Sequence, residues 1–459
     1  MILRKDNKDF LLVTEDLTFN FKFGAHPDFV KDYLNKVRLY YQGKGEHPIL
    51  DVGVNIKEFF NALHPEVYVL PRNRHLNFVD EWEDNIGLEI IKLPFSSFDF
   101  WIDEEFEGLF YEVKSNQAFC RLGAISQLGY LVPPLDEKDK DYTNISYIVP
   151  IFPHTRWIHS LLTGVLMEII LAKNQFCFSK RSPIVLAAVL HDIATAAGGD
   201  SVMRISPELE EEKNFSEVVG KNSWNKVLKR KYDFDLEIAA GWVKGEGLYG
   251  KLLDVVDKIS YTAMDCFHLG SQKNGAVRQF CLQHPLIMDV WQDVRVNDQE
   301  VYFSDAERLY NFLLLRAFEH KELLYDPRCR TLDFFLTLKV GDLYQQGIIT
   351  KEDLLNGDND WLERVLAIYF PDNFKTYISP DDYGWKKFKT QAEQEKFIKS
   401  VGDNFDHAEY IKGFNTGLDW KVEYKGGVRP LCEVINKEKV RKLEQINESI
   451  KGYCVYYKI

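Results

Sequence analysis

The sequence has few features of a secreted or membrane protein. Its 459 residues include seven cysteines, none of them in a Cys-x-x-Cys pair. Scattered cysteines exclude a disulfide framework or a zinc finger as the basis of the fold. The chain also lacks an apolar run long enough to cross a bilayer, and its first residues are too acidic for a signal peptide. We therefore expect a cytoplasmic protein with reduced thiols and no membrane segment.

Basic residues are in the minority. The chain has 57 lysines and arginines against 70 aspartates and glutamates, so its formal net charge is −13. This balance disfavours a surface that coats nucleic acid, and nucleic acid is not an indicated partner. Internal repeats and low-complexity tracts are absent too. With 45% hydrophobic and 14% aromatic residues, the chain is expected to form well-packed cores.

Three regions of the chain differ in their pattern. Residues 1–110 are rich in aromatic and β-branched residues, which predicts an α+β region. Residues 111–345 have helical spacing, and residues 346–459 mix helices with strands. The predicted strands lie in 11–23, 66–71, 87–102, 422–435 and 452–459, and the main predicted helices in 112–129, 153–174, 182–192, 247–270 and 305–325. The predicted fold class is mainly α: a helical core with α+β additions at the N- and C-terminal ends.

Two metal-binding side chains stand together at the end of a predicted helix. The apolar stretch SPIVLAAVL runs directly into His191 and Asp192, and a small glycine-bearing loop follows. On the preceding predicted helix, Arg156 and His159 lie three residues apart and therefore share a face. A single His-Asp pair is common by chance, so the interpretation depends on further ligands.

A third predicted helix supplies carboxylates. Asp257, Tyr261 and Asp265 are spaced four apart in a segment that is otherwise apolar. Burying a carboxylate is costly unless a positive charge neutralises it. A metal ion would do so, and so would an ion pair with a neighbour such as Lys258. Both alternatives stay open for these carboxylates.

The pattern as a whole predicts a metal centre of two imidazoles and two carboxylates. The candidate ligands are His159, His191, Asp192 and Asp257. Imidazole with carboxylate suits Fe, Mn, Zn or Ni better than Ca or Mg. Four protein ligands on a metal that prefers six leave positions for water and substrate, and water there becomes a nucleophile near neutral pH. Such a site favours hydrolysis without a covalent intermediate.

The order of these motifs resembles the HD superfamily of metal-dependent phosphohydrolases. The stretches FCRLGAISQLG, PHTRWIHSL, HD, DVVDKISYTAMDCFHLG and LLLRAFEHK follow one another as in the dNTP triphosphohydrolase branch, which includes bacterial dGTPases and the vertebrate SAM-and-HD-domain dNTPase. The resemblance covers residues 115–335. It implies an HD-domain helical core, a divalent metal (Mn, Fe, Mg, Zn, Ni or Co), a nucleotide substrate and a homo-oligomer.

The resemblance also implies roles for matching residues. His159, His191, Asp192 and Asp257 would bind the metal and be catalytic. A second set of residues would contact the substrate. Arg156 and Lys258 would bind phosphate with their positive charges. Gln127, Tyr261 and Asp265 would lie near the sugar. His320 and Lys321 match positions that touch a regulatory nucleotide in some members.

The loop after the HD dipeptide departs from the family pattern. Ala194 replaces a glycine, Thr195 replaces the first histidine, and Asp200 stands near the last one. Threonine is a poor general acid because its pKa lies far from neutral. The proton donor could instead be Asp200 or a glutamate within 208–217, with a pKa raised in a dry pocket. A leaving group of low pKa would need no acid.

Three functions are compatible with this sequence. The first is a dNTP triphosphohydrolase that releases triphosphate and deoxynucleoside. The second is an HD phosphodiesterase or nucleotidase acting on cyclic, oligo- or mononucleotides, which the altered loop favours. The third is a non-catalytic nucleotide-binding module with a residual metal site. Gly198 and Gly199 either cradle phosphate with their amides or form a simple turn at a helix end.

Overall fold

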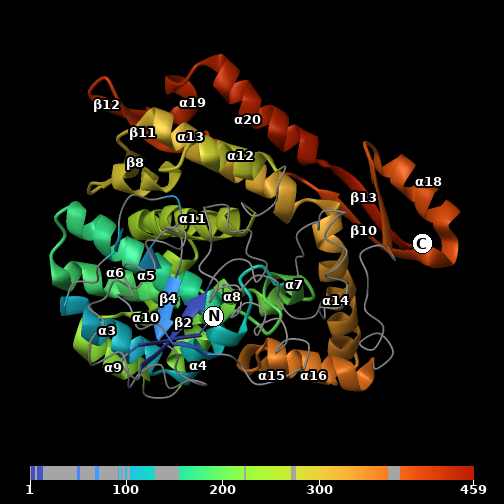
Figure 1. Ribbon diagram of the computed structural model, residues 1–459, viewed down its shortest axis with the longest axis horizontal. Helices are drawn as coiled ribbons and strands as arrows, with labels where there is room; N and C mark the ends of the chain where they lie inside the picture. The colour runs from blue at the N-terminus through green and yellow to red at the C-terminus, as the bar shows by residue number, and fades with distance from the viewer. Residues whose placement is uncertain are drawn as a thin grey trace.

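A computed structural model describes residues 104–129, 155–221, 224–269, 275–370 and 383–459, together with short strands and Phe95 within the first 100 residues. Helices make up most of these ranges, and small sheets are added to them (Figure 1). This arrangement confirms the predicted mainly α class with α+β additions. Among the described residues, no helix is both long and apolar enough to span a bilayer.

The first 100 residues contribute short strands. Their bounds are β1 Ile2–Lys5, β2 Lys8–Val13, β3 Ile49–Asp51, β4 Tyr68–Pro71, β5 Ile91–Lys92 and β6 Asp99–Phe100. The first four form one sheet in the order β3-β1-β2-β4, and the last two pair with each other. The predicted strand at 66–71 therefore contains β4, and the segment 87–102 contains β5 and β6. Residues 14–23 of the first predicted strand lie outside the described residues.

The centre of the molecule is a layered helical body (Figure 1). Its helices are α3 Glu104–Lys114, α4 Gln117–Cys120, α5 Arg156–Lys173, α6 Phe178–Leu190, α7 Asp200–Met203, α8 Glu211–Gly220, α9 Trp224–Tyr232, α10 Leu236–Val243, α11 Gly247–Leu269, α12 Ala276–Gln283 and α13 Ala306–Glu319, with a π-helical turn at His320–Leu324. The helices predicted over 153–174, 182–192, 247–270 and 305–325 are thus confirmed. Their apolar side chains form the main core.

The single helix predicted over 112–129 is wrong. The chain instead forms α3, then α4, then a 3-10 turn at Arg121–Ala124. The side chain of Asn116 accepts a hydrogen bond from the Ala118 amide, and this cap starts a new helix because it satisfies an otherwise free N–H group. Beyond the turn the chain is extended, and the carbonyl of Ile125 accepts a hydrogen bond from the amide of Arg156.

Helices α5 and α6 approach each other closely at a glycine. A Cβ atom on Gly164 would lie 2.1 Å from Cγ2 of Val189, well inside van der Waals contact. Gly164 lies in α5 one turn beyond His159, and Val189 lies in α6 just before His191. The small residue therefore sets the separation of the two helices that carry the histidines.

A second core lies beside the main one. It is formed by helices α14 Pro327–Gln345, α15 Lys351–Asn356 and α16 Asn359–Tyr369, packed against residues 196–209. The buried side chains include Ala196 and Val202 on one side and Leu336 and Leu354 on the other. The loop that follows His191 and Asp192 is thus enclosed between the two cores.

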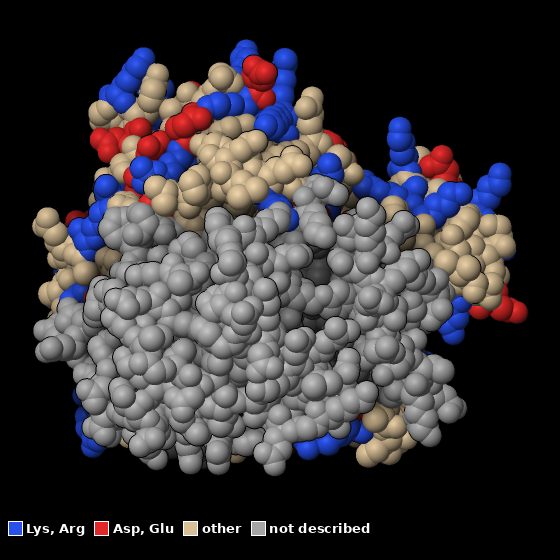
Figure 2. Space-filling model, in the orientation of Figure 1, with Lys and Arg blue, Asp and Glu red and all other residues tan. Residues whose placement is uncertain are grey.

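The C-terminal part adds two sheets. Its elements are β9 Tyr383–Phe388, α18 Gln391–Val401, β10 Phe405–Ile411, β11 Lys421–Tyr424, β12 Gly427–Pro430, α19 Leu431–Val434, α20 Lys437–Ile450 and β13 Gly452–Lys458. One sheet has the order β10-β13-β9, and the other is β12-β11-β8-β7, with β7 Val294–Val296 and β8 Val301–Phe303. The strand predicted in 452–459 is confirmed; the segment 422–435 contains β11 and β12, but its end, Leu431–Val434, is helix α19 and not a strand. Figure 2 shows charges of both signs over the edge formed by α19 and α20.

The close contact at Gly164 yields a stability test. Gly164→Ala should destabilise the fold by about 1–3 kcal/mol, because the added methyl group overpacks the α5–α6 interface. Val189→Ala removes Cγ2 of Val189, the atom that the added methyl group would contact. In chemical denaturation, the double variant should therefore lose less stability than the sum of the two single losses. Strict additivity would show that the contact does not set the helix separation.

Candidate metal centre

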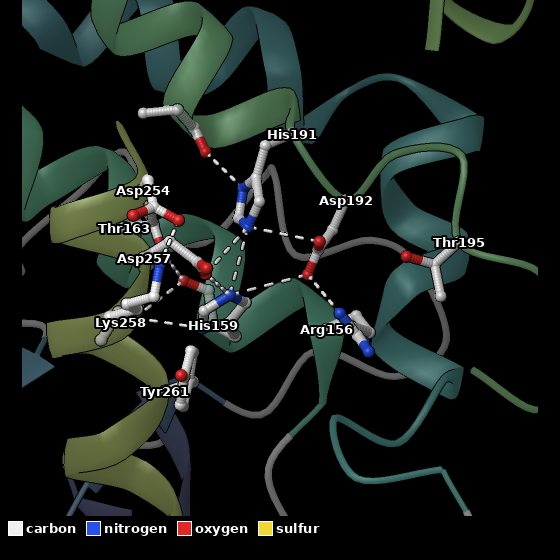
Figure 3. Close-up of polar contacts among 12 residues, drawn as sticks. Arg156, His159, Thr163, His191, Asp192, Thr195, Asp254, Asp257, Lys258 and Tyr261 are labelled. Carbon is white, nitrogen blue, oxygen red and sulfur yellow. Dashed lines mark hydrogen bonds and ion pairs between the residues drawn. The ribbon is translucent and has the colours of Figure 1, made fainter. Parts of the chain in front are cut away.

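Three helices bring four candidate ligands to one point. His159 lies in the first turn of α5, His191 and Asp192 directly follow α6, and Asp257 lies in the middle of α11. Figure 3 shows the two imidazole rings next to each other, edge to face, with Asp192 on one side of the pair and Asp257 on the other. The structure thus places all four predicted ligands together.

The donor atoms of these residues converge. Nε2 of His159 and Nε2 of His191 are 3.2 Å apart. Oδ1 of Asp257 lies 2.9 Å from the first nitrogen and 3.3 Å from the second. Oδ1 of Asp192 lies 3.2 Å from Nε2 of His191, and its Oδ2 lies 3.6 Å from Nε2 of His159. Ligand atoms of His159, His191 and Asp192 all fall within 4.8 Å of one another.

Hydrogen bonds on the far side orient each ring, and the one at His191 fixes its tautomer. Nδ1 of His191 lies 2.7 Å from the carbonyl oxygen of Ala188, which can only accept, so this nitrogen carries the hydrogen. Nδ1 of His159 lies 3.1 Å from Oγ of Ser260, whose hydroxyl can donate to the carbonyl of His159. In a neutral ring, Nε2 then presents its lone pair to the site. Such outer hydrogen bonds are typical of metal-binding histidines.

The spacing of the donors fits a divalent cation. Two nitrogens that are each bound at 2.0–2.1 Å lie roughly 2.8–3.4 Å apart when their bond angle is between octahedral and tetrahedral. The separation of the two Nε2 atoms, 3.2 Å, falls within that range. Two imidazoles and two carboxylates are a donor set that suits Mn, Fe, Zn, Ni or Co. The residues therefore fit the metal that the sequence predicts.

Arg156 binds two carboxylates. Its Nη1 donates to Oδ2 of Asp192 at 3.0 Å, and its Nη2 forms an ion pair with Asp200. The guanidinium is buried, whereas the side chain of Asp200 is 48% exposed. Arg156 therefore orients the carboxylate of Asp192, a candidate ligand, through its buried Nη1. Its outer nitrogen could exchange Asp200 for a substrate phosphate, because both are anions that a guanidinium binds well.

The site holds strong negative charge. Burial raises the pKa of Asp257, but hydrogen bonds to His159 and His191 outweigh burial and keep this pKa far below its usual range. Burial lowers the pKa of His191, but the carboxylates of Asp192 and Asp257 outweigh it and raise this pKa to about 9. The carboxylates thus attract positive charge strongly, and a metal ion competes with the proton for the histidine.

The loop after Asp192 is tied to its surroundings. The amides of Gly198 and Gly199 donate to Oδ1 of Asn359 and to the carbonyl of Ala196, so the turn interpretation holds and these amides do not cradle phosphate. Both glycines have positive φ, which a residue with a side chain adopts at a cost. Thr195, which is fully buried, donates from Oγ1 to Oε2 of Glu211 at 2.6 Å.

Two of the predicted substrate residues on α11 have protein partners. Nζ of Lys258 forms an ion pair with Asp254 one turn earlier and lies 5.9 Å from the ring centre of Trp420. The hydroxyl of Tyr261 accepts a hydrogen bond of 2.8 Å from Nε of Arg316. Lys258 therefore stands beside the ligand Asp257 with an exchangeable partner, whereas Tyr261 is fixed by a buried guanidinium.

The other predicted contacts are buried, apart from Lys321. Burial raises the pKa of Asp265, and the carboxyl of Glu319 from α13 lies beside it, so the two share a dry environment. Gln127 is buried, and its Oε1 has no hydrogen-bond partner within the described ranges. His320 is buried and packs its ring 4.6 Å from that of Phe414, while Lys321 is exposed. Substrate or nucleotide contacts by these residues stay predictions.

Four residues of the site were missed by sequence reasoning. Ser260 holds His159, Arg316 holds Tyr261, and Glu319 lies beside Asp265. Arg121 donates from Nη2 to the carbonyls of Ile193 and Thr195 and from Nη1 to that of Gly357. An arginine within the apolar stretch FCRLG was the available signal, because a buried guanidinium needs several acceptors. The other three depend on contacts between distant segments.

Comparisons with known proteins give the fold. Neither the protein-family models nor the curated proteins include a match. The chain is similar to the structure of a hypothetical protein from Aquifex aeolicus, with a TM-score of 0.58 and 18% identity over 78% of this chain and 93% of that one. It is also similar to a phosphohydrolase from Bacteroides thetaiotaomicron, with a TM-score of 0.52 and 15% identity over 79% of this chain and 100% of that one. At these identities the likeness shows a shared fold.

Removing one imidazole tests the centre. His159→Ala should abolish bound metal, measured by elemental analysis of the purified protein, because three remaining donors hold a cation poorly. Helical content by circular dichroism should stay close to that of the wild type. The matched control is His284→Ala, a partly buried histidine after α12. Equal metal content in the wild type and the His159 variant would rule out this centre.

Proposed function

We propose that the protein is a metal-dependent phosphohydrolase that acts on nucleotides, and that it cleaves dNTPs to triphosphate and deoxynucleoside. The observation that carries the proposal is the convergence of two imidazoles and two carboxylates from three helices, with both Nε2 atoms within 3.3 Å of Asp257. The shared fold with a phosphohydrolase supports the reaction class. The motif order that resembles dNTP triphosphohydrolases supports the substrate.

The chemistry follows from the charges around the site. His159, His191, Asp192 and Asp257 would hold a divalent cation, which would supply Lewis acidity and lower the pKa of water at the site. The oxygen of water forms a bond to the α-phosphorus, and the bond from phosphorus to the 5′-oxygen breaks. Arg156 and Lys258 stabilise the negative charge on the phosphoryl oxygens. Each of them already binds a carboxylate, Asp200 or Asp254, in the place that an anionic phosphate would take.

One observation favours a second function. The hydroxyl of Tyr261, which the resemblance assigns to the sugar, is occupied by Arg316, and Arg316 also donates to the carbonyl of Asn415. The sugar end of the site is therefore packed by the protein itself. This favours a phosphodiesterase or nucleotidase that acts on a cyclic, oligo- or mononucleotide with the same metal ligands.

A substrate panel distinguishes these functions. Purified protein with defined metal content should be incubated with each dNTP, cyclic nucleotides, a dinucleotide and mononucleotides, with Mn, Fe, Co or Mg added. The expected products from dNTPs are triphosphate and deoxynucleoside, separated by ion-exchange chromatography. Phosphate or a ring-opened nucleotide without triphosphate would support the second function. Full metal occupancy with no turnover of any substrate would leave a nucleotide-binding module.

Lys258 tests the phosphate contact. Lys258→Met should lower kcat/KM for the substrate roughly 10- to 100-fold, which corresponds to the loss of one charge-assisted hydrogen bond. Bound metal should be unchanged, because Lys258 pairs with Asp254 and not with a ligand. Lys251→Met is the matched control, since Lys251 is exposed on the same helix. Similar kinetics for the two variants would exclude Lys258 from substrate binding.

A further inference from the structure

The position of the missing histidine is filled by a hydroxyl that is bonded to a carboxyl. Thr195 follows Asp192 in the same turn, and its amide donates to the carbonyl of Asp192 at 2.9 Å. Its Oγ1 donates to Oε2 of Glu211 at 2.6 Å. The pair therefore joins the first residue of α8 directly to the turn that carries a metal ligand.

The backbone before α8 fixes Glu211 in this place. The side chain of Asn214 donates to the carbonyls of Glu208 and Glu210, each at 2.8 Å, so the turn into the helix is held by its own first residues. Leu209 is fully buried in the second core. Glu211 is therefore positioned by packing and hydrogen bonds, and its side chain does not depend on a flexible loop.

The charges around Glu211 favour its protonated form. Burial is the largest cause, and the neighbouring carboxylates of Asp192 and Asp200 add to it. Arg156 and the hydrogen bond from Thr195 oppose these effects, and the resulting pKa is about 8. Because the hydroxyl of Thr195 donates to Oε2, the proton of the neutral carboxyl lies on Oε1. At neutral pH the side chain is thus an acid that holds its proton.

We propose that Glu211, held by Thr195, donates the proton to the leaving oxygen of the substrate. The proposal rests on the proposed phosphohydrolase function. As the bond between phosphorus and the leaving oxygen breaks, the electron pair remains on that oxygen and takes the proton from Oε1 of Glu211. Water gives its oxygen to phosphorus, and the proton that it releases restores the carboxyl. Thr195 is a positioning residue, because its hydroxyl is turned toward Glu211.

Two other carboxyls fit this role less well. Asp200 is held by an ion pair with Arg156, and its side chain is 48% exposed to water. Asp265 follows Asp257 by eight residues on α11, and its side chain hydrogen-bonds to Glu319. Its carboxyl lies beside that of Glu319. Glu211 is the carboxyl that Thr195 connects to the turn after Asp192.

The test compares two leaving groups. Glu211→Gln should lower kcat roughly 10²- to 10⁴-fold for a dNTP or the nucleotide substrate found active, since its leaving alkoxide needs a proton. The loss should be under about 10-fold for a p-nitrophenyl nucleotide ester, because nitrophenolate leaves without one. Bound metal should match that of the wild type. Glu212→Gln, an exposed neighbour on α8, is the matched control and should change neither rate.

A pH profile gives a second measurement. An acid must hold its proton, so kcat for the alkoxide substrate should be high at neutral pH and fall at the higher pH where Glu211 of the substrate-bound protein ionises. This fall in rate at high pH should be absent in Glu211→Gln. Difference infrared spectra between wild type and Glu211→Gln should show a protonated carboxyl below that pH and a carboxylate above it. Thr195→Val should weaken the pH dependence of the rate, and Thr195→Ser should restore it.

The outcomes separate the two proposals. Equal losses on both leaving groups, or no loss on either, would overturn the role of Glu211 while the phosphohydrolase function stood. A carboxylate signal from the substrate-bound protein at neutral pH would also overturn it. If the metal-loaded wild-type protein cleaved neither substrate class, the proposed function itself would fail, and the proton donor with it.

Discussion

The organisation of this protein depends on carboxylates that lie between apolar helices, one of them buried and the other 29% exposed. Asp192 and Asp257 face the same histidine pair, and the guanidinium that touches this group, Arg156, already binds a second anion. In a dry interior, unneutralised negative charge costs several kcal/mol per group. A divalent cation would satisfy that charge and both imidazole lone pairs at once. The rest of the site is arranged around this requirement: outer hydrogen bonds fix the rings, and Arg156 fixes a carboxylate.

Such an arrangement works only on a rigid frame. The ligands come from α5, α6 and α11, and a shift of one helix by one ångström would separate their donor atoms. Gly164 permits the close contact of α5 and α6, and Arg121 binds carbonyls on both sides of the loop between the two cores. Gly164 leaves space for the neighbouring helix, and Arg121 provides a hydrogen-bond donor for buried carbonyls. The second core therefore has a role in the site although it contributes no ligand.

Local patterns predicted the parts of this structure that depend on local physics. The apolar spacing of α5, α6, α11 and α13 shows which face of each helix is buried, and two adjacent ligand residues at the end of α6 are visible in the sequence. The break at Asn116 was missed because one side-chain cap outweighs the helical spacing around it. The pairing of Arg316 with Tyr261 joins residues 55 positions apart, which no spacing rule reaches.

Glu211 is a second example of a site residue that local sequence patterns cannot identify. The sequence marks residues 208–217 as acidic, but only the fold shows which carboxyl is near Thr195. A threonine cannot replace a histidine as an acid, yet its hydroxyl can hold the carbonyl oxygen of a protonated carboxyl. A cation at the neighbouring ligands lowers the pKa of such a carboxyl, and an arriving phosphate raises it. The proton is therefore held most firmly when the substrate is present, which is when the leaving oxygen requires it.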